Sequence, residues 1–367
     1  MKKIFFALIS CALLFSSCTF SRISDVPSSQ LQSVFFHGTY IDKGSIYRTG
    51  SPYTTLFDVN HSFQHASVSP LSTGILAFDS VKNMTSWYGV LYYITNKGTI
   101  ISRTYMDDTS MVIHNDYALS QSEVYDADGF SYSLYKVKND SLGSFASNPL
   151  EKIWTGNLDC FRSSVLFMGD EYDTVYLAGA SYDNETNTLY RYTKEQSDFS
   201  EIFSTPHRTK LINTQSTETS SDFMYLISLQ DGSLIIYPSQ NVRAASFYEV
   251  FLLPEGETIP LKLSVSGVPS HALCFAGRGF ETNGKIGITM ALSEDEGGPV
   301  GMAVFTLSGT DLVCENIIEN TYAASYVYGK DPNTGAYWYY GDSSTCSKDG
   351  NALCCFDGVS VTEQSLP

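Results

Sequence analysis

The chain has 367 residues, of which 43% are hydrophobic and 17% are charged, and its formal net charge is −17. A chain of this length and composition can bury a sizeable core, and one β domain of this size is ordinary. Its acidity works against binding to phosphate backbones, so nucleic acid is not expected as a partner. The 25 Tyr and 22 Phe favour β-strands over helices.

The chain begins with a basic and then apolar segment. Lys2 and Lys3 precede residues 4–15, which are as long as the core of a secretory leader and short for a membrane-spanning helix. This segment ends in Ser16-Ser17-Cys18. The ending resembles the lipobox of bacterial lipoproteins, although Phe15 stands where that family usually has Leu.

The resemblance covers these 18 residues and implies a signal peptide at 1–17 and a lipidated Cys18 as the mature N-terminus. It implies a protein anchored through palmitate and related acyl chains to a membrane of the bacterial envelope, on its periplasmic or surface side. Cys11 also follows a lipobox-like sequence, but cleavage there would leave an apolar core of only a few residues. The alternative is an ordinary cleaved leader.

A serine-rich segment without periodicity follows at 18–32 and predicts a flexible tether. The domain itself is expected at 33–367, where short β-like runs alternate with turn signals and no amphipathic helix pattern is found. Glycines 232, 284 and 335 each stand in a turn beside a predicted strand, and glycine supplies the positive φ that tight hairpins require.

Dividing the runs into groups of four strands gives units that begin near residues 33, 72, 117, 163, 223, 272 and 323. Such repetition predicts an all-β fold, a β-propeller of seven blades with four antiparallel strands each, in which radial repetition protects the strand edges. Six or eight blades also fit. The main competing architecture is a multi-sheet sandwich or a pair of β domains.

Two of the predicted hairpins share a sequence motif, Asp-x-x-Thr-[Gly/Asn]-x-x-[Trp/Tyr]-x-Tyr, which begins at Asp183 and again at Asp331. The spacing of the two copies is about three units of ~49 residues, within the range of propeller blades. The motif resembles the repeat of quinoprotein-type propellers, with one residue fewer between Gly335 and Trp338. The resemblance implies a blade hairpin whose Asp and Thr bond nearby amides, and it does not imply a cofactor.

Three further features of the sequence are possible sites of chemistry. Cys354 and Cys355 resemble the neighbouring cysteines of some quinoprotein dehydrogenases, but no other cofactor residue of that family is matched, so no quinone site is assigned. His61 and His65 could share one face of a strand, but no third ligand at metal spacing accompanies them. The sequence from Asp126 begins like a calcium loop and lacks its later ligands, so a hairpin turn is predicted there. No metal, cofactor or catalytic residue is predicted.

A disulfide between Cys346 and Cys354 is predicted from hairpin geometry. A three-residue turn at 349–351 would place these cysteines opposite each other, at a distance that a disulfide can span. Export to an oxidising compartment would favour the bond. Reduced, buried cysteines are the alternative.

The function predicted from these features is a binding or scaffold module at the cell envelope, which recognises a protein or a glycan through one propeller face. The expectation is that the protein is not an enzyme. The alternative is a carbohydrate-active hydrolase or lyase with its site in the central funnel. Two facing carboxylates at that funnel would favour the enzyme.

Overall fold

The structure is a computed structural model. It describes residues 39–42, 45–48, 54–58, 67–71, 74–82, 87–95, 100–105, 110–114, 116–126, 129–138, 142, 148–168, 174–181, 186–206, 209–213, 216–219, 223–239, 249–293, 298–330, 334–342, 348 and 352–365. These residues contain strands and turns, and none of their segments is a helix long and apolar enough to cross a membrane.

Within each sheet most neighbouring strands are also neighbours along the chain, and those pairs are antiparallel. The first sheet described comprises β1 (Thr39–Asp42), β2 (Ser45–Arg48) and β3 (Thr54–Asp58). The second comprises β4 (Ser67–Leu71), β5 (Gly74–Lys82), β6 (Trp87–Thr95) and β7 (Ile100–Tyr105). The third comprises β8 (Ser110–His114), β9 (Tyr117–Asp126), β10 (Gly129–Val137) and β11 (Leu150–Leu158).

The later sheets repeat this pattern. The fourth comprises β12 (Phe161–Met168), β13 (Thr174–Ala180), β14 (Thr186–Thr193) and β15 (Asp198–Pro206). A separate hairpin of β16 (Thr209–Asn213) and β17 (Ser216–Thr219) precedes the fifth sheet. That sheet comprises β18 (Phe223–Ser228), β19 (Leu234–Ser239), β20 (Phe251–Leu253) and β21 (Leu261–Lys262).

The sixth sheet comprises β22 (Ser264–Ser266), β23 (Cys274–Thr282), β24 (Lys285–Ala291), β25 (Val300–Ser308) and β26 (Asp311–Thr321). The seventh comprises β27 (Ala323–Lys330), β28 (Tyr337–Asp342), β29 (Ala352–Phe356) and β30 (Val361–Ser365).

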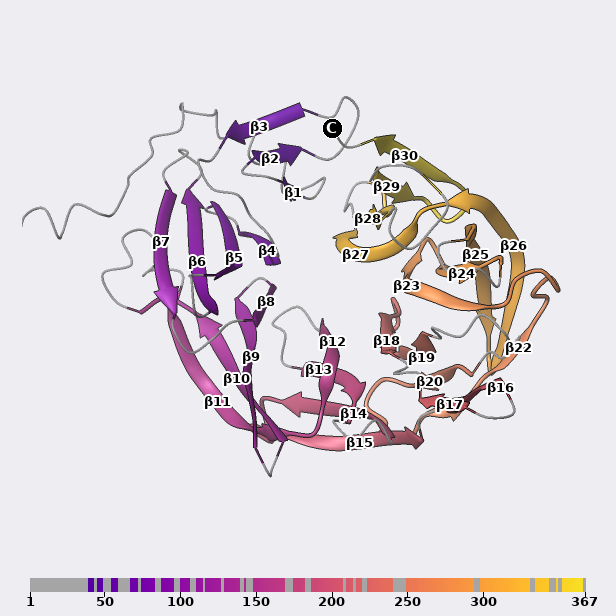
Figure 1. Ribbon diagram of the computed structural model, residues 1–367, viewed down its shortest axis with the longest axis horizontal. Helices are drawn as coiled ribbons and strands as arrows, with labels where there is room; N and C mark the ends of the chain where they lie inside the picture. The colour runs from indigo at the N-terminus through magenta and orange to yellow at the C-terminus, as the bar shows by residue number, and fades with distance from the viewer. Residues whose placement is uncertain are drawn as a thin grey trace, which may run out of the picture.

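The sheets stand side by side in a ring, with one edge strand of each facing the middle (Figure 1). This radial arrangement is a β-propeller, so the predicted fold class is confirmed. The number of blades stays a prediction, because stretches around the first sheets lie outside the described residues.

The core lies between the sheets. Five clusters of buried apolar side chains are found in the part of the chain that the structure describes, and each fills the space between two successive sheets. Each cluster contains side chains from both of its sheets. Examples from the five clusters, in chain order, are Leu91 and Ile113, Tyr132 and Val175, Ala178 and Ile236, Ile235 and Phe305, and Met302 and Tyr339. Burying each large side chain contributes about 1.5–3 kcal/mol, so the propeller is held together blade against blade.

A short strap joins the fifth and sixth sheets at their outer edges. After β21 the chain adds β22 to the next sheet, where Ser264 pairs in parallel with Asp311 on the outer strand β26. Gly267 then turns the chain with φ +73°, and a Cβ atom there would lie 2.5 Å from the carbonyl oxygen of Cys314. The strap therefore depends on glycine at this position.

Hairpin turns of successive sheets also hydrogen-bond to each other. The amide of Gln230 donates to Glu281 Oε2 over 2.7 Å, and Asn283 Nδ2 donates to the carbonyl of Asp357 over 3.0 Å. Thr282 Oγ1 donates to the carbonyl of Gly335. These bonds fix the end of β23 between the sheets on either side.

The turn glycines predicted from the sequence behave as expected. Glycines 232, 284 and 335 have φ values of +84°, +73° and +72°. Asn283 also has positive φ, and Thr282 pairs with Lys285, which makes a two-residue hairpin of the type that favours Asn-Gly. Asp126 pairs with Gly129, so the predicted hairpin turn there is confirmed as well.

The predicted starts of the units agree with the fourth, fifth and last sheets, which begin at Phe161, Phe223 and Ala323, and are wrong for two earlier ones. The second and third sheets begin at Ser67 and Ser110, and not near residues 72 and 117. The first strand of the second sheet is short and contains two Ser and a Pro, and that of the third sheet has only three apolar residues between Ser110 and His114, so neither was recognised as the start of a unit. The β16–β17 hairpin and the parallel strand β22 were not predicted, because both are short and polar.

Candidate binding site at the central opening

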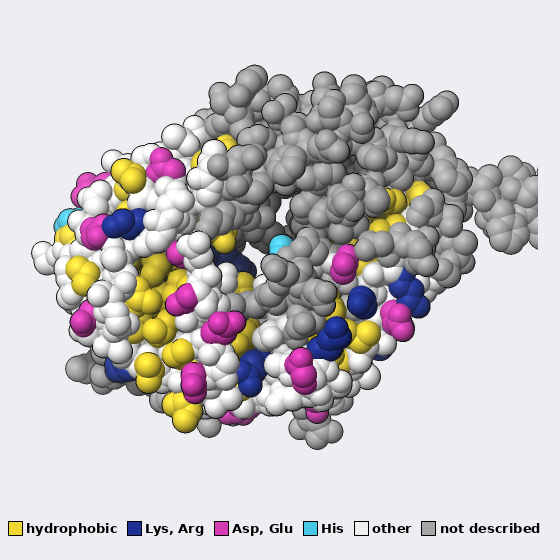
Figure 2. All heavy atoms as spheres, turned by 180° about the vertical axis from the view of Figure 1, so that it is seen from behind, with side chains coloured by type: hydrophobic (Ala, Val, Ile, Leu, Met, Phe, Trp, Pro, Cys, Tyr) yellow, Lys and Arg dark blue, Asp and Glu magenta, His cyan; other side chains and the backbone are white. Residues whose placement is uncertain are grey.

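The inner edge strands surround an opening in the propeller. Strands β4, β8, β12, β18, β23 and β27 face the middle of the ring (Figure 1). From behind, the molecule is hollowed near its centre, and basic and histidine side chains lie beside the opening (Figure 2). The inner strands therefore bring side chains from distant parts of the chain to one place.

A bulge in β23 presents Arg278 at this inner edge. The register with β24 shifts between Phe275 and Gly279, so that the intervening residues are not regularly paired. A Cβ at Gly277 would lie 3.2 Å from the carbonyl oxygen of Ala324 on β27, and one at Gly279 would lie 2.8 Å from the carbonyl oxygen of Gly287. A side chain at residue 279 would therefore collide with the backbone of β24, and one at residue 277 would be tightly packed. Bulges of this kind redirect a side chain.

Aromatic side chains hold Arg278 in place. Its guanidinium carbon lies 5.5 Å from the ring centroid of Tyr225 on β18, a cation–π contact between successive sheets. Behind it, the hydroxyl of Tyr237 on β19 donates to the carbonyl of Gly277 over 3.0 Å. Burial raises the pKa of Tyr237 well above its ordinary value, so this hydroxyl keeps its proton and remains a donor.

The carboxylate on the same strand is engaged elsewhere. Glu281 is 9% exposed and accepts the amide of Gln230, as described above. Arg278 is partly exposed, and the structure gives it no ion pair with any carboxylate that it describes. Arg278 is thus a partly exposed cation on the inner strand β23, supported by an aromatic ring.

His114 lies at the end of another inner strand, β8. Its ring stacks on Phe167 of β12, with centroids 6.0 Å apart and an interplanar angle of 28°. Desolvation by burial lowers the pKa of His114, which favours the neutral ring near pH 7. His114 is nevertheless exposed at its surface, and its stacking on Phe167 links the third sheet to the fourth.

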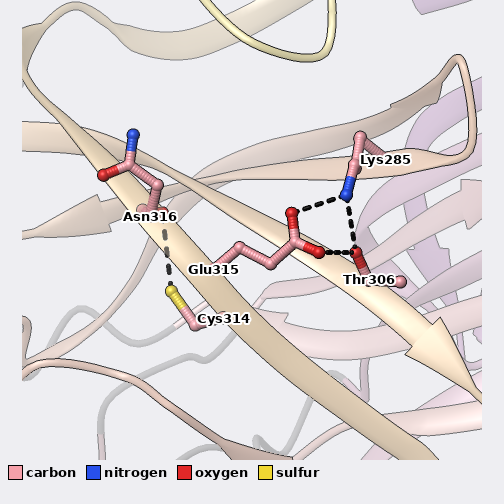
Figure 3. A network of polar contacts seen from close by, with 5 residues as sticks. All are labelled: Lys285, Thr306, Cys314, Glu315 and Asn316. Atoms are coloured by element: carbon pink, nitrogen blue, oxygen red, sulfur yellow. Dashed lines mark hydrogen bonds and ion pairs between the residues drawn. The ribbon is translucent and has the colours of Figure 1, made fainter.

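A second polar network runs across β24, β25 and β26 of the sixth sheet and is structural (Figure 3). Lys285 Nζ is 2.5 Å from Glu315 Oε2 and 3.0 Å from Thr306 Oγ1, and Thr306 donates to Glu315 Oε1 over 2.6 Å. Next to it, the Cys314 thiol faces the carbonyl of Asn316 at 3.5 Å. The network ties β24, β25 and β26 together across their faces.

Hydrogen bonds from Lys285 and Thr306 lower the pKa of Glu315. We expect Lys285→Met to raise that pKa toward the ordinary value of a glutamate, because the donor and the positive charge are both lost. The measurement is an NMR titration of the side-chain carboxyl carbon. The propeller should remain folded, and an unchanged titration midpoint would contradict the network.

Most residues that the sequence singled out fall outside the described part of the chain. Cys18, His61, His65 and Cys346 are among them. Among the described residues no group of three or more His, Cys, Asp or Glu side chains could hold a metal ion. Thr334 Oγ1 accepts the amide of Ala336, which agrees with the local role predicted for the second copy of the motif.

The register assumed for the predicted disulfide is wrong. Cys354 on β29 pairs with Tyr339 on β28 and with Glu363 on β30, so Cys346 is not its cross-strand partner. The connection between β28 and β29 is longer than the three-residue turn that was assumed, since Gly341 already pairs with Ala352. The disulfide itself stays a prediction.

Comparisons with known proteins identify the fold. No protein-family model matches the sequence, and no curated protein matches it either. Solved structures do match. This chain shares its fold with them, but little of its sequence.

A prolyl endopeptidase aligns with a TM-score of 0.53 and 9% identity over 92% of this chain and 51% of its own. A candidate 6-phosphogluconolactonase of Bacteroides fragilis gives 0.53 and 11% over 89% and 92% of the two chains. A protein of Lactobacillus plantarum gives 0.50 and 12% over 90% and 94%. This chain spans about half the length of the endopeptidase, and at these identities the likeness concerns the fold alone.

Sequence reasoning missed Arg278 and Tyr225. The Gly277-Arg278-Gly279 triplet inside an otherwise strand-like run was the available signal, because glycine inside a strand marks a bulge or a close approach. Its partner Tyr225 is 53 residues earlier. The two residues meet only because the fifth and sixth sheets pack side by side.

Proposed function

We propose that this protein is a lipid-anchored binding module of the bacterial envelope, which recognises a partner through the propeller face around its central opening. The observation that carries the proposal is the pairing of Arg278 with Tyr225 at the inner edge. Arginine and tyrosine are enriched in the parts of protein surfaces that contribute most to binding. The rigid, repeated blades would hold these side chains in a fixed arrangement.

The alternative function, a hydrolase or lyase acting on carbohydrate, needs an acid and a base near the opening. Glu281 is the carboxylate among the described inner-strand side chains, and it is bonded to the Gln230 amide. Because Glu281 is already engaged by this hydrogen bond, binding is favoured over catalysis. The similarity to hydrolytic enzymes concerns the fold alone, so it supports neither binding nor catalysis.

The test is capture of a partner from envelope extracts by the full-length protein in detergent. We expect wild-type protein to retain a partner and Arg278→Gln to retain at least tenfold less, with Lys285→Gln as a control that removes an ion-paired cation from another strand of the same sheet. Equal retention by all three proteins, or none by any, would contradict a binding role for this face.

The anchor is tested separately. We expect Cys18→Ala to move the protein from the detergent phase to the aqueous phase, because the acyl chains would no longer be attached. Phase partitioning followed by immunoblotting measures this. Cys11→Ala is the matched control and should remain in the detergent phase; the reverse behaviour of the two variants would place the lipid on Cys11.

A further inference from the structure

Arg278 forms no ion pair with any described carboxylate, in contrast to three lysines of the described chain. Lys262 Nζ lies 3.0 Å from Glu249 Oε1, Lys285 is bonded to Glu315, and Lys348 to Glu363. Those lysines are on outer strands or turns. Arg278 is on an inner strand, partly buried, and its described contact is with the Tyr225 ring.

The contact with Tyr225 leaves the hydrogen-bonding capacity of the guanidinium unused. A cation over an aromatic ring interacts through its charge, and an arginine side chain carries five N–H donors in a planar fork. The neighbouring acceptors are already engaged, because Gly277 O accepts from Tyr237 and Glu281 from the Gln230 amide. Because Arg278 is partly exposed, its remaining N–H donors are open to water or to a ligand that displaces it.

We propose that the central opening binds a ligand through a carboxylate group, which pairs with the guanidinium of Arg278. This inference rests on the proposed binding function and names the chemical group that is recognised. A single arginine matches a planar monoanion, which it can bind with two parallel hydrogen bonds. A phosphate dianion would need further positive charge, and no second cation is placed with Arg278 and Tyr225 among the described contacts.

The experiment is a ligand-observed NMR titration of the full-length protein at constant ionic strength. The probes are N-acetylglycine against N-acetylglycinamide, and glucuronate against glucose, so that each pair differs in its charge. We expect at least one carboxylate to bind at least tenfold more tightly than its neutral analogue. The pair that shows the difference tells whether an amino-acid or a sugar carboxylate is preferred.

Two variants locate the site. Arg278→Gln should weaken carboxylate binding at least tenfold, whereas Lys285→Gln, which removes the same charge from the ion pair with Glu315, should leave it unchanged. Should Arg278→Gln fail to fold, the difference between charged and neutral probes on the wild-type protein still decides.

Equal binding of charged and neutral probes, or equal weakening by both variants, would overturn the inference. These outcomes are separable from a failure of the proposed function. A protein that captures an envelope partner but does not distinguish the probes remains a binding module without a carboxylate site.

Discussion

Replacing Tyr237 with Ala should lower the free energy of unfolding by about 3–5 kcal/mol, as expected for deleting a large buried ring. Tyr237 is fully buried in the cluster between the fifth and sixth sheets, and its ring meets the edge of Phe275 with centroids 5.1 Å apart. Chemical denaturation followed by fluorescence or circular dichroism measures the loss. Leu261→Ala is the matched control, because Leu261 is 46% exposed.

Tyr237→Phe separates the hydroxyl from the ring. We expect a smaller cost of about 1–3 kcal/mol, because the buried carbonyl of Gly277 loses the hydrogen bond from the hydroxyl. The bulge that carries Arg278 would be less firmly held, so carboxylate binding should weaken too. Stability and binding both equal to wild type would contradict the role assigned to this hydroxyl.

Gly267→Ala should destabilise the protein by about 3 kcal/mol, the sum of a left-handed backbone and an overpacked contact. The added Cβ would meet the carbonyl oxygen of Cys314 at 2.5 Å, and this backbone atom cannot move without displacing β26. The strap β22 would then separate from the outer edge of the sixth sheet. Denaturation curves again provide the measurement.

Gly256→Ala is a closely matched control for this prediction. Gly256 also has positive φ, +77°, but a Cβ there would have nothing within 4 Å. Gly256→Ala should therefore lower the free energy of unfolding only through the left-handed backbone conformation, by about 1–2 kcal/mol. If the two variants are equally stable, the close approach of the strap to Cys314 is not a source of stability.

Local signals allowed the fold class to be predicted. The Asn283-Gly284 turn, the two Asp-x-x-Thr hairpins and the regular return of apolar runs specify antiparallel strands joined by short turns, and the fourth and last sheets appear where they were expected. These features depend on backbone conformation within a few residues, which glycine and asparagine determine directly.

The site depends on contacts that no local pattern encodes. Arg278 and Tyr225 are in different sheets, and the bulge that exposes Arg278 is stabilised by Tyr237 from a third strand. The predicted disulfide illustrates the same difficulty. The hairpin register around Cys354 could not be found from turn chemistry, because the connection from β28 is long and the pairing is set by packing of the whole sheet.

The measurement that tests the central claim most directly is mass spectrometry of the captured partner before and after incubation with the full-length protein. The account predicts a stable complex and a partner recovered with unchanged mass. Products that accumulate with time, persist through purification of the protein and disappear when the inner-strand carboxylate Glu281 is replaced with Gln would contradict it and establish an enzyme.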